Sequence, residues 1–274
     1  MLIKDFFFSF KNINLNLIEK GKKLKTITTS ISVLYKFLIL DSLFYNFFYK
    51  KNLDGKNKEL FDKDLNHLFR FFNSYKIEHE YSKIYEKYFE NFRNEEVNIL
   101  EIGIAKGDGL ASFFYYFPNS KLIGLDNNPF RIRYKSNRIR HIFTDISSKK
   151  ILSNLSKHIN EKFDIIIEDC SHKLIDQILC FSHMFYKLKD GGYYIVEDLN
   201  FPEINKIHNP TNEDLNLKNI LKKIKNNENI KSKFMDNNQY DYIKNNVESI
   251  NFEKGKGDFS EIVFIKKKLS NNYV

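Results

Sequence analysis

Three acidic residues and one histidine stand where two apolar segments end. Asp169 follows the segment FDIIIE, Glu197 and Asp198 follow GGYYIV, and His172 comes three residues after Asp169. If the two segments are neighbouring parallel strands, their carboxyl ends open on one crevice and the carboxylates converge. Such carboxylates repel one another, and a hard divalent cation such as Mg²⁺ relieves that repulsion. We therefore predict a metal site at Asp169, Glu197 and Asp198; the alternative is that one acid caps a helix and another faces solvent.

His172 has the chemistry of a proton acceptor. An imidazole can be neutral near pH 7, and a hydroxyl bound to a metal cation loses its proton more readily. We predict that His172 is a general base, the alternative being a histidine that caps the following helix. Four other histidines have no acidic partners in the sequence pattern, and we expect structural or surface roles for His141, His158, His183 and His208.

A glycine-rich segment, Glu101-Ile-Gly103-Ile-Ala-Lys-Gly107-Asp-Gly109, follows the apolar stretch VNIL. Glycine is needed where a backbone turns sharply and comes close to a ligand. Its spacing, E-x-G-x-x-x-G-x-G, differs from the G-x-G-x-x-G of dinucleotide sites. We predict that Glu101, Gly103 and Gly107 line a cofactor pocket, the alternative being a tight turn without a ligand.

Two further acids end strand-length segments. Asp126 lies 25 residues after Glu101, where a carboxylate can accept both hydrogen bonds of a ribose diol. Sites for NAD use the same device, so Asp126 alone does not identify the cofactor. Asp145 ends the next segment, and it could instead cap a helix beside Ser147 and Ser148.

Five apolar segments of strand length each end in an acid and are separated by amphipathic stretches. The key acids lie 19 to 28 residues apart, which is the length of one strand plus one helix. The segments are 97–104, 121–126, 140–145, 163–169 and 191–198. Such strands, apolar on both faces, predict an α/β fold with a doubly wound, mostly parallel sheet.

The C-terminal end of the chain has a different pattern. Segments 248–254 and 260–267 are joined by the short loop GKGDF, which predicts an antiparallel hairpin and brings the sheet to seven strands. A dehydrogenase-type fold is expected to end in a sixth parallel strand instead. A helix is predicted at about 78–93 from its aromatic residues at spacings of three and four.

This layout resembles the Rossmann-like fold of class I S-adenosylmethionine (SAM)-dependent methyltransferases. The blocks EIGIAKGDG, FDIIIEDCSHKLIDQ and GGYYIVEDLN resemble the metal-dependent macrocin and mycinamicin type of sugar O-methyltransferases, which have cephalosporin-hydroxylase-like and rhamnosyl O-methyltransferase relatives. The resemblance covers about residues 76–200.

The resemblance implies SAM and Mg²⁺ as cofactors and a small, sugar-containing acceptor. It assigns the metal to Asp169, Glu197 and Asp198 and the role of base to His172. Asp145 would face the adenine amino group. Lys76 and Tyr81 resemble the segment that folds over the cofactor in this family.

Two differences from the family pattern stand at the site. Cys170 occupies a position where the family has glycine, and Tyr75 replaces a common aspartate before Lys76. A non-glycine residue at position 170 requires an ordinary backbone angle or some strain. The loop from Phe201 to Pro210 matches no pattern of the family, and we expect it to cover the acceptor and set its choice.

The net charge of +9 is concentrated near the N-terminus. Residues 1–56 hold 10 lysines and 4 acids, whereas the rest of the chain holds 34 basic and 31 acidic groups. A nucleic-acid partner is therefore not expected, but peripheral membrane contact through residues 1–56 is possible. The apolar stretch 30–49 contains Lys36 and Asp41, which favours a helix packed on protein over a membrane span.

These features predict two parts: an aromatic helical extension, 1–75, with an accessory or oligomerisation role, and a methyltransferase domain, 76–274. Without a recognisable signal peptide and with only two cysteines, the chain is expected to be cytoplasmic. The extension has more aromatic residues than it can bury alone, so we also expect a homo-oligomer. Three alternatives stay open: a metal-independent methyltransferase, an NAD-linked oxidoreductase, and a basic RNA- or membrane-binding module without catalysis.

Overall fold

The computed structural model describes residues 4–5, 8, 50–128, 131–211, 213 and 215–270. Most of the predicted N-terminal extension, including the apolar stretch 30–49, lies outside these residues. The oligomerisation and membrane roles expected of that extension therefore stay predictions. Among the described residues, no helix combines the length and apolar character needed to cross a membrane.

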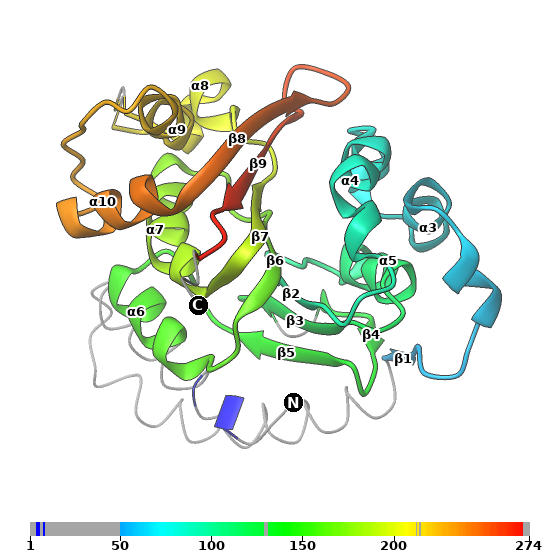
Figure 1. Cartoon of the computed structure of the whole chain (residues 1–274). Helices are drawn as coiled ribbons and strands as arrows, with labels where there is room; N and C mark the ends of the chain where they lie inside the picture. Colours follow the sequence, from blue (N-terminus) through cyan, green and yellow to red (C-terminus); the bar gives the residue numbers. More distant parts are fainter. Residues whose placement is uncertain are drawn as a thin grey trace, which may run out of the picture.

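A seven-stranded sheet forms the centre of the molecule (Figure 1). Its strands are β2 (Asn98–Ile102), β3 (Lys121–Asp126), β5 (Ile139–Phe143), β6 (Phe163–Glu168), β7 (Leu188–Val196), β8 (Val247–Lys254) and β9 (Glu261–Lys267). Their order is β5-β3-β2-β6-β7-β9-β8. The first five are parallel, whereas β9 runs antiparallel to both β7 and β8. The predicted α/β fold with its terminal hairpin is confirmed.

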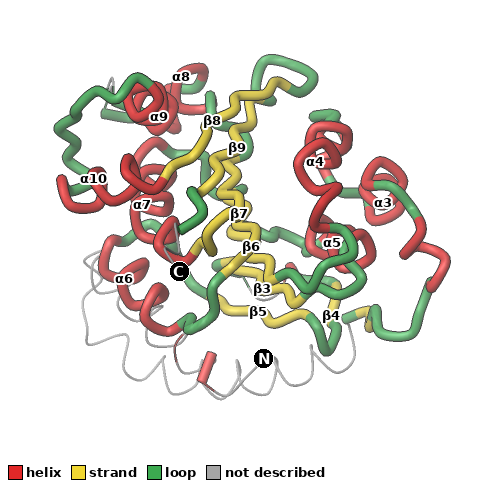
Figure 2. The backbone as a smooth tube through the Cα atoms, in the orientation of Figure 1, coloured by secondary structure: helices red, strands yellow, loops and turns green. Residues whose placement is uncertain are grey.

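Helices cover both faces of the sheet (Figure 2). One face carries α3 (Leu65–Phe72), α4 (Tyr81–Phe89) and α5 (Asp108–Tyr116), and the other carries α6 (Lys149–His158), α7 (Leu174–Met184) and α10 (Asn237–Asn246). Helix α9 (Leu217–Lys225) also contributes to the core on the side of α6, α7 and α10. The smaller elements are α8 (Phe201–Ile204) and the two-stranded sheet of β1 (Lys51–Asn52) and β4 (Tyr134–Lys135).

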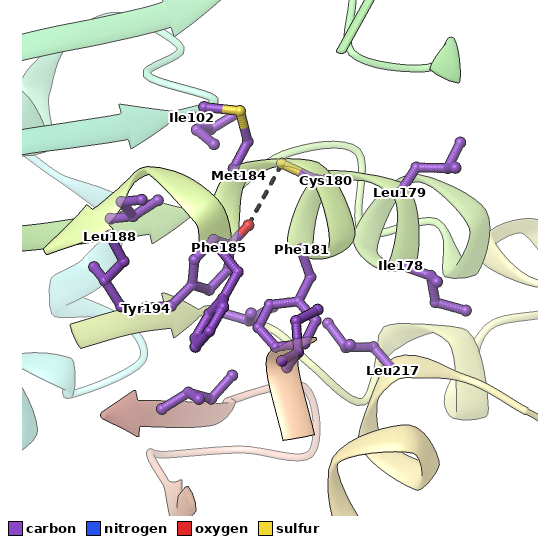
Figure 3. Packing of buried hydrophobic residues seen from close by; sticks show 14 of the residues in the cluster. Ile102, Ile178, Leu179, Cys180, Phe181, Met184, Phe185, Leu188, Tyr194 and Leu217 are labelled. Atoms are coloured by element: carbon purple, nitrogen blue, oxygen red, sulfur yellow. Dashed lines mark hydrogen bonds between the residues drawn. The ribbon is translucent and has the colours of Figure 1, made fainter. Parts of the chain in front are cut away.

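Strand β6 shows why the sheet has a hydrophobic core on each of its two faces. Ile165 and Ile167 belong to the cluster under α3–α5, and Ile166 belongs to the cluster under α6, α7 and α10. Successive side chains of a strand point to opposite faces, so an entirely apolar strand must be covered twice. In the second cluster Phe181 packs against Tyr194, whose hydroxyl donates to Cys180 Sγ at 3.5 Å (Figure 3). Burying each such side chain contributes about 1.5–3 kcal/mol.

Residues before position 76 are part of this architecture. Leu65, Leu68 and Phe69 of α3 are fully buried in the cluster that α5 completes. Further upstream, the carboxylate of Asp5 is fully buried and binds Arg140 through two hydrogen bonds of 2.6 and 2.7 Å. The described part of the extension is thus attached to the domain, and the boundary at residue 75 stays a prediction.

The helix expected at 78–93 is shorter than predicted. Helix α4 spans Tyr81–Phe89 and is flanked by 3-10 turns at Tyr75–Ile77 and Glu90–Phe92. Glu80 has a left-handed backbone, with φ of 55°, and an α-helix cannot continue through it. This break separates Lys76 from α4, and it allows Lys76 to reach the sheet edge described next.

Candidate active site

The loop after β2 approaches the end of β6 so closely that only glycine fits. Gly103 has φ of +92°, and a Cβ placed there would lie 2.1 Å from the carbonyl oxygen of Asp169. Gly107 is also left-handed, with φ of +83°, where the chain enters α5. Gly103 thus has both predicted features, a sharp turn and a close approach, whereas Gly107 has only the turn, since a Cβ there would lie 3.7 Å from its nearest neighbour. Gly107 is not among the residues that line the two cavities described next, and its role in cofactor binding stays a prediction.

A cavity of about 270 Å³ opens beside this loop, at the carboxyl ends of β2, β3 and β6. Asp126 and Asp145 both line it, and Asp145 also accepts a hydrogen bond from the backbone N–H of Ser147 at 2.9 Å. Their binding of a nucleoside stays a prediction. Asp126 also accepts hydrogen bonds from the backbone N–H groups of Ala105 and Asn128, each at 2.8 Å. These bonds hold its carboxylate at the wall of the cavity.

Thr144 adds a polar group to the same wall. It lines the cavity, is only 2% exposed, and its hydroxyl oxygen has no hydrogen-bond partner among the described residues. A buried polar group without a partner costs free energy, and a bound ligand removes that cost by supplying one. Nothing in the sequence pattern distinguished this threonine.

A second cavity, of about 80 Å³, shares Gly103, Ala105, Arg131 and Asp169 with the first. Glu101 lines it and is 1% exposed. One of its carboxylate oxygens lies 3.2 Å from Lys76 Nζ, and the other, Oε2, is buried without a hydrogen-bond partner in the described part of the chain. Burial raises the pKa of Glu101 to about 7, although Lys76 opposes the rise. This cavity therefore offers an acceptor to a cationic group.

Lys76 lies at the centre of the acidic residues. Its ammonium group contacts Asp169 at 2.7 Å, Glu197 at 2.6 Å and Glu101 at 3.2 Å, and the residue is 4% exposed. Although burial lowers the pKa of Lys76, the three carboxylates outweigh that effect and raise it well above its usual value. The lysine is thus a fixed positive charge, in contact with predicted metal ligands.

Two buried tyrosines orient the acids after β7. Tyr85 donates a hydrogen bond to Glu197, and Tyr81 donates one to Asp198 at 2.8 Å. Burial raises the pKa of both carboxyl groups, and the neighbouring charge of Asp169 raises them further. The cluster has more negative charge than Lys76 balances, so it favours an additional cation.

Asp169 and Asp198 are the carboxylates best placed to hold that cation, and His172 lies beside them. One possible ligand atom of each lies within 4.8 Å of the others. The His172 Nε2 atom is 3.8 Å from Asp198 and 4.0 Å from Asp169. Two carboxylates and an adjoining surplus of negative charge fit a hard divalent ion. Glu197, the third predicted ligand, contacts Lys76 and Tyr85 instead of joining this group.

The backbone at the site is unusual at three positions. Ser171, His172 and Asp198 have φ values of 46°, 50° and 51°, a region that side chains other than glycine disfavour. Cys170 is not among the residues with positive φ, which agrees with the ordinary backbone angle expected there as one alternative; the left-handed angles occur at the next two residues. Such backbone strain is concentrated at functional sites, and here it accompanies the placement of His172 beside both aspartates.

The structure also reveals residues that the sequence pattern did not assign. Glu168 is fully buried, and burial raises its pKa to about 8, with the Cys170 thiol donating to it at 3.4 Å. The His208 ring, expected to be structural or exposed, lies 6.3 Å from that of His172. Only the folded loop 201–210 brings it there.

Comparisons with known proteins agree with this architecture. A protein-family model described as a methyltransferase domain matches residues 93–266. The chain is 33% identical over 128 residues to 8-demethyl-8-alpha-L-rhamnosyl tetracenomycin-C 2'-O-methyltransferase of Streptomyces olivaceus, covering 44% of this chain and 33% of that protein. It is 30% identical over 132 residues to mycinamicin VI 2''-O-methyltransferase of Micromonospora griseorubida, covering 44% and 32%.

Among solved structures, the MycE methyltransferase from the mycinamycin pathway in complex with Mg, SAH and mycinamycin VI has a TM-score of 0.60 and 22% identity. The likeness covers 77% of this chain and 56% of that one. The chain spans about a third of the length of the curated relatives it matches. The matched family segment contains six strands of the sheet in full, all but the last residue of β9, and more than half of the chain. The chain belongs to the methyltransferase domain family.

Proposed function

We propose that this protein transfers a methyl group from SAM to a hydroxyl of a sugar or glycoconjugate precursor, assisted by Mg²⁺. The observation that carries the proposal is the position of Asp169. This residue lines both cavities and also lies in one group with Asp198, the other carboxylate proposed to hold the cation, and with His172. A cofactor in the cavities and a hydroxyl at the cation would therefore meet at one residue.

The two cavities fit the two ends of SAM. The larger cavity has carboxylates at Asp126 and Asp145 for a nucleoside and an unpartnered hydroxyl at Thr144. The smaller one has the free Oε2 of Glu101 for an ammonium group. When bound, SAM supplies an activated methyl group that transfers to an attacking oxygen. A solved relative's name includes SAH and Mg, and the names of curated relatives describe sugar O-methylation.

Asp169 and Asp198 would hold Mg²⁺, with Glu197 next to them. The ion would supply positive charge that favours the ionised form of an acceptor hydroxyl. Tyr81 orients Asp198 by its hydrogen bond, and Lys76 orients Asp169 and Glu197. These residues thus set the position of the acceptor oxygen, and positioning is the main requirement when the leaving group is already good.

His172 is the proposed general base. Its Nε2 atom faces Asp169 and Asp198, whose negative charges stabilise the imidazolium formed when it takes the hydroxyl proton. The other ring nitrogen, Nδ1, is buried without a partner. The ring packs on Phe201 at 4.8 Å between centroids, which fixes its plane.

The test uses the full chain with SAM and a panel of glycosides. His172→Ala should lower turnover at least ~10²-fold, the usual scale for loss of a general base, while calorimetry still detects SAH binding. EDTA should abolish turnover. Full activity in EDTA would instead favour a metal-independent methyltransferase, and binding of NADH without SAH would favour an oxidoreductase.

We also propose a cellular compartment and an oligomeric state for the enzyme. Cys170 and Cys180 are both free thiols, which agrees with a reducing, cytoplasmic compartment. Association into homo-oligomers through residues 1–75 is part of the proposal, and size-exclusion chromatography of the full chain with light scattering tests it.

A further inference from the structure

The smaller cavity, which Glu101 lines, has a second buried acid. Asp108 is the first residue of α5, lines the same cavity and is 7% exposed. Its Oδ1 atom, like Oε2 of Glu101, is buried and has no hydrogen-bond partner among the described residues. Each of these acceptors costs free energy while it is unpaired. The cavity therefore presents two buried carboxylate oxygens to a ligand.

The first turn of α5 lies against Glu101. A Cβ placed at Gly109, the residue after Asp108, would lie 2.8 Å from Oε1 of Glu101. Burial raises the pKa of both carboxyl groups, and the charge of Asp108 raises that of Glu101 further. The two carboxylates therefore repel each other, and an ammonium group bound beside them relieves that repulsion.

The cations that line this cavity, in the part of the chain that the structure describes, are less suited to hold a ligand carboxylate. Lys76 is buried, but it already contacts three carboxylates within 3.2 Å. Arg131 is exposed, and Lys106 is half-buried, with its ammonium group 5.9 Å from the ring centroid of the exposed Tyr75. Exposed ion pairs contribute little, because water screens them.

The N-terminus of α5 is the other group that could attract an anion. The end of a helix with unpaired N–H groups carries a partial positive charge. Asp108 adds a negative charge in the first turn, and this charge opposes the binding of a ligand carboxylate there. The cavity therefore favours the ammonium group of an amino-acid ligand over its carboxylate.

We infer that Asp108 is a further cofactor-binding residue, and that Asp108 and Glu101 together select a ligand by its amino group and tolerate the loss of its carboxyl group. The inference rests on the proposed function, in which the smaller cavity takes the amino-acid end of SAM. An ammonium group has three N–H donors and can serve both acids with charge-assisted hydrogen bonds. The site thus also takes thioadenosines that end in a primary amine, such as decarboxylated SAM.

Calorimetry on the full chain, without added metal, compares three ligands. They are SAH, its analogue without the carboxyl group, and its analogue without the amino group. The decarboxylated analogue should bind within about fivefold of SAH, the scale of one exposed ion pair. The analogue without the amino group should bind about 10- to 100-fold more weakly than SAH, because it leaves both buried acceptors unpaired.

Asp108→Asn tests the residue itself. The substitution should weaken binding of SAH and of the decarboxylated analogue by about tenfold each, because a charge-assisted hydrogen bond is lost. It should leave the affinity for the analogue without the amino group unchanged. Asp176→Asn is the matched control, because Asp176 is 5% exposed and lines the larger cavity but not the smaller one. Any effect of the control should be equal for the three ligands.

Three results would overturn the inference. They are a decarboxylated analogue that binds more than about tenfold more weakly than SAH, an analogue without the amino group that binds as tightly as SAH, and an Asp108→Asn variant that changes the three affinities equally or not at all. If that variant does not fold, the comparison of the three ligands on the unmodified chain decides alone.

SAH affinity separates these results from failure of the proposed function. If SAH binds and the other results are negative, the preference for the amino group is wrong and the methyltransferase proposal stands. If SAH does not bind, the proposed function itself is wrong.

Discussion

Replacing Lys76 with methionine tests whether the acidic cluster is held together by one buried ammonium group. Methionine keeps the apolar length of the side chain and removes its charge. Glu101, Asp169 and Glu197, all within 3.2 Å of Lys76 Nζ, then lose their shared partner. Two of these carboxylates have side chains only 2% and 3% exposed, so water does not replace the lysine fully.

The magnitude follows from this burial. Removing one partner of a buried ion pair costs about 3–5 kcal/mol, because an uncompensated charge remains. In EDTA the free energy of unfolding of Lys76→Met should therefore fall by about that amount. A divalent cation bound at Asp169 and Asp198 replaces part of the lost positive charge. Mg²⁺ should thus stabilise the variant more than it stabilises the unmodified chain, by about 1–2 kcal/mol.

The measurement is urea unfolding of both proteins, followed by circular dichroism in EDTA and in Mg²⁺. Lys267→Met is the matched control, because Lys267 is 5% exposed and is paired with Asp190 at 3.0 Å away from the site. It should also lose stability, but equally with and without Mg²⁺. The reasoning is refuted if Lys76→Met loses less than about 1 kcal/mol in EDTA, or if Mg²⁺ stabilises both proteins equally.

Three other substitutions probe the cavities and the N-terminal contact. Glu101→Gln should weaken SAH binding about 10- to 100-fold in calorimetry, because a charge-assisted hydrogen bond to the ligand ammonium is lost; unchanged affinity would remove Glu101 from the cofactor site. Thr144→Val should weaken SAH binding by about fivefold without lowering the stability of the ligand-free protein, since the hydroxyl has no partner there; a destabilised apo-protein would contradict this. Although burial raises the pKa of Asp5, hydrogen bonds from Arg140 and His158 lower it below the ordinary 3.8. The ionised Asp5 therefore stabilises the folded protein at pH values above 3.8. This stabilisation is lost as the pH falls through the lowered pKa that Asp5 has in the folded state. The stability difference between the unmodified chain and Asp5→Asn, about 3 kcal/mol at pH 6 by urea unfolding, should shrink toward pH 2; a pH-independent difference would refute the assignment.

The sequence was sufficient to predict the sheet because the strands carry their own pattern. Each is apolar on both faces and ends near an acid, and the hairpin is marked by a glycine-containing loop. That regularity placed Asp126, Asp145 and Asp169 at one edge, and the structure has all three lining one cavity. The first residue of α4 was less predictable, because Glu80 adopts a left-handed backbone conformation that a glutamate does not indicate in a sequence.

The parts of the site that the sequence did not predict depend on contacts between distant residues. Lys76 and Asp169 are 93 positions apart, and no local pattern indicates that a lysine joins the acids. Asp108 has the sequence position of an ordinary acid in the first turn of a helix, and only the folded structure brings it to the cavity that Glu101 lines. The orphaned hydroxyl of Thr144 is recognisable only when burial and hydrogen bonds are both known.

The charge distribution at the site links stability to the proposed catalysis. Lys76 neutralises Glu197 and one oxygen of Asp169, while Asp198 is bonded by Tyr81 but has no lysine contact among the described residues. The excess negative charge is therefore concentrated between Asp169 and Asp198, beside His172. If Lys76 neutralised these two aspartates fully, the attraction for a divalent ion would be lost, and without Lys76 the buried acids would be too costly to hold together. Partial neutralisation meets both requirements, because it leaves negative charge only where the proposed cation and the acceptor hydroxyl would bind.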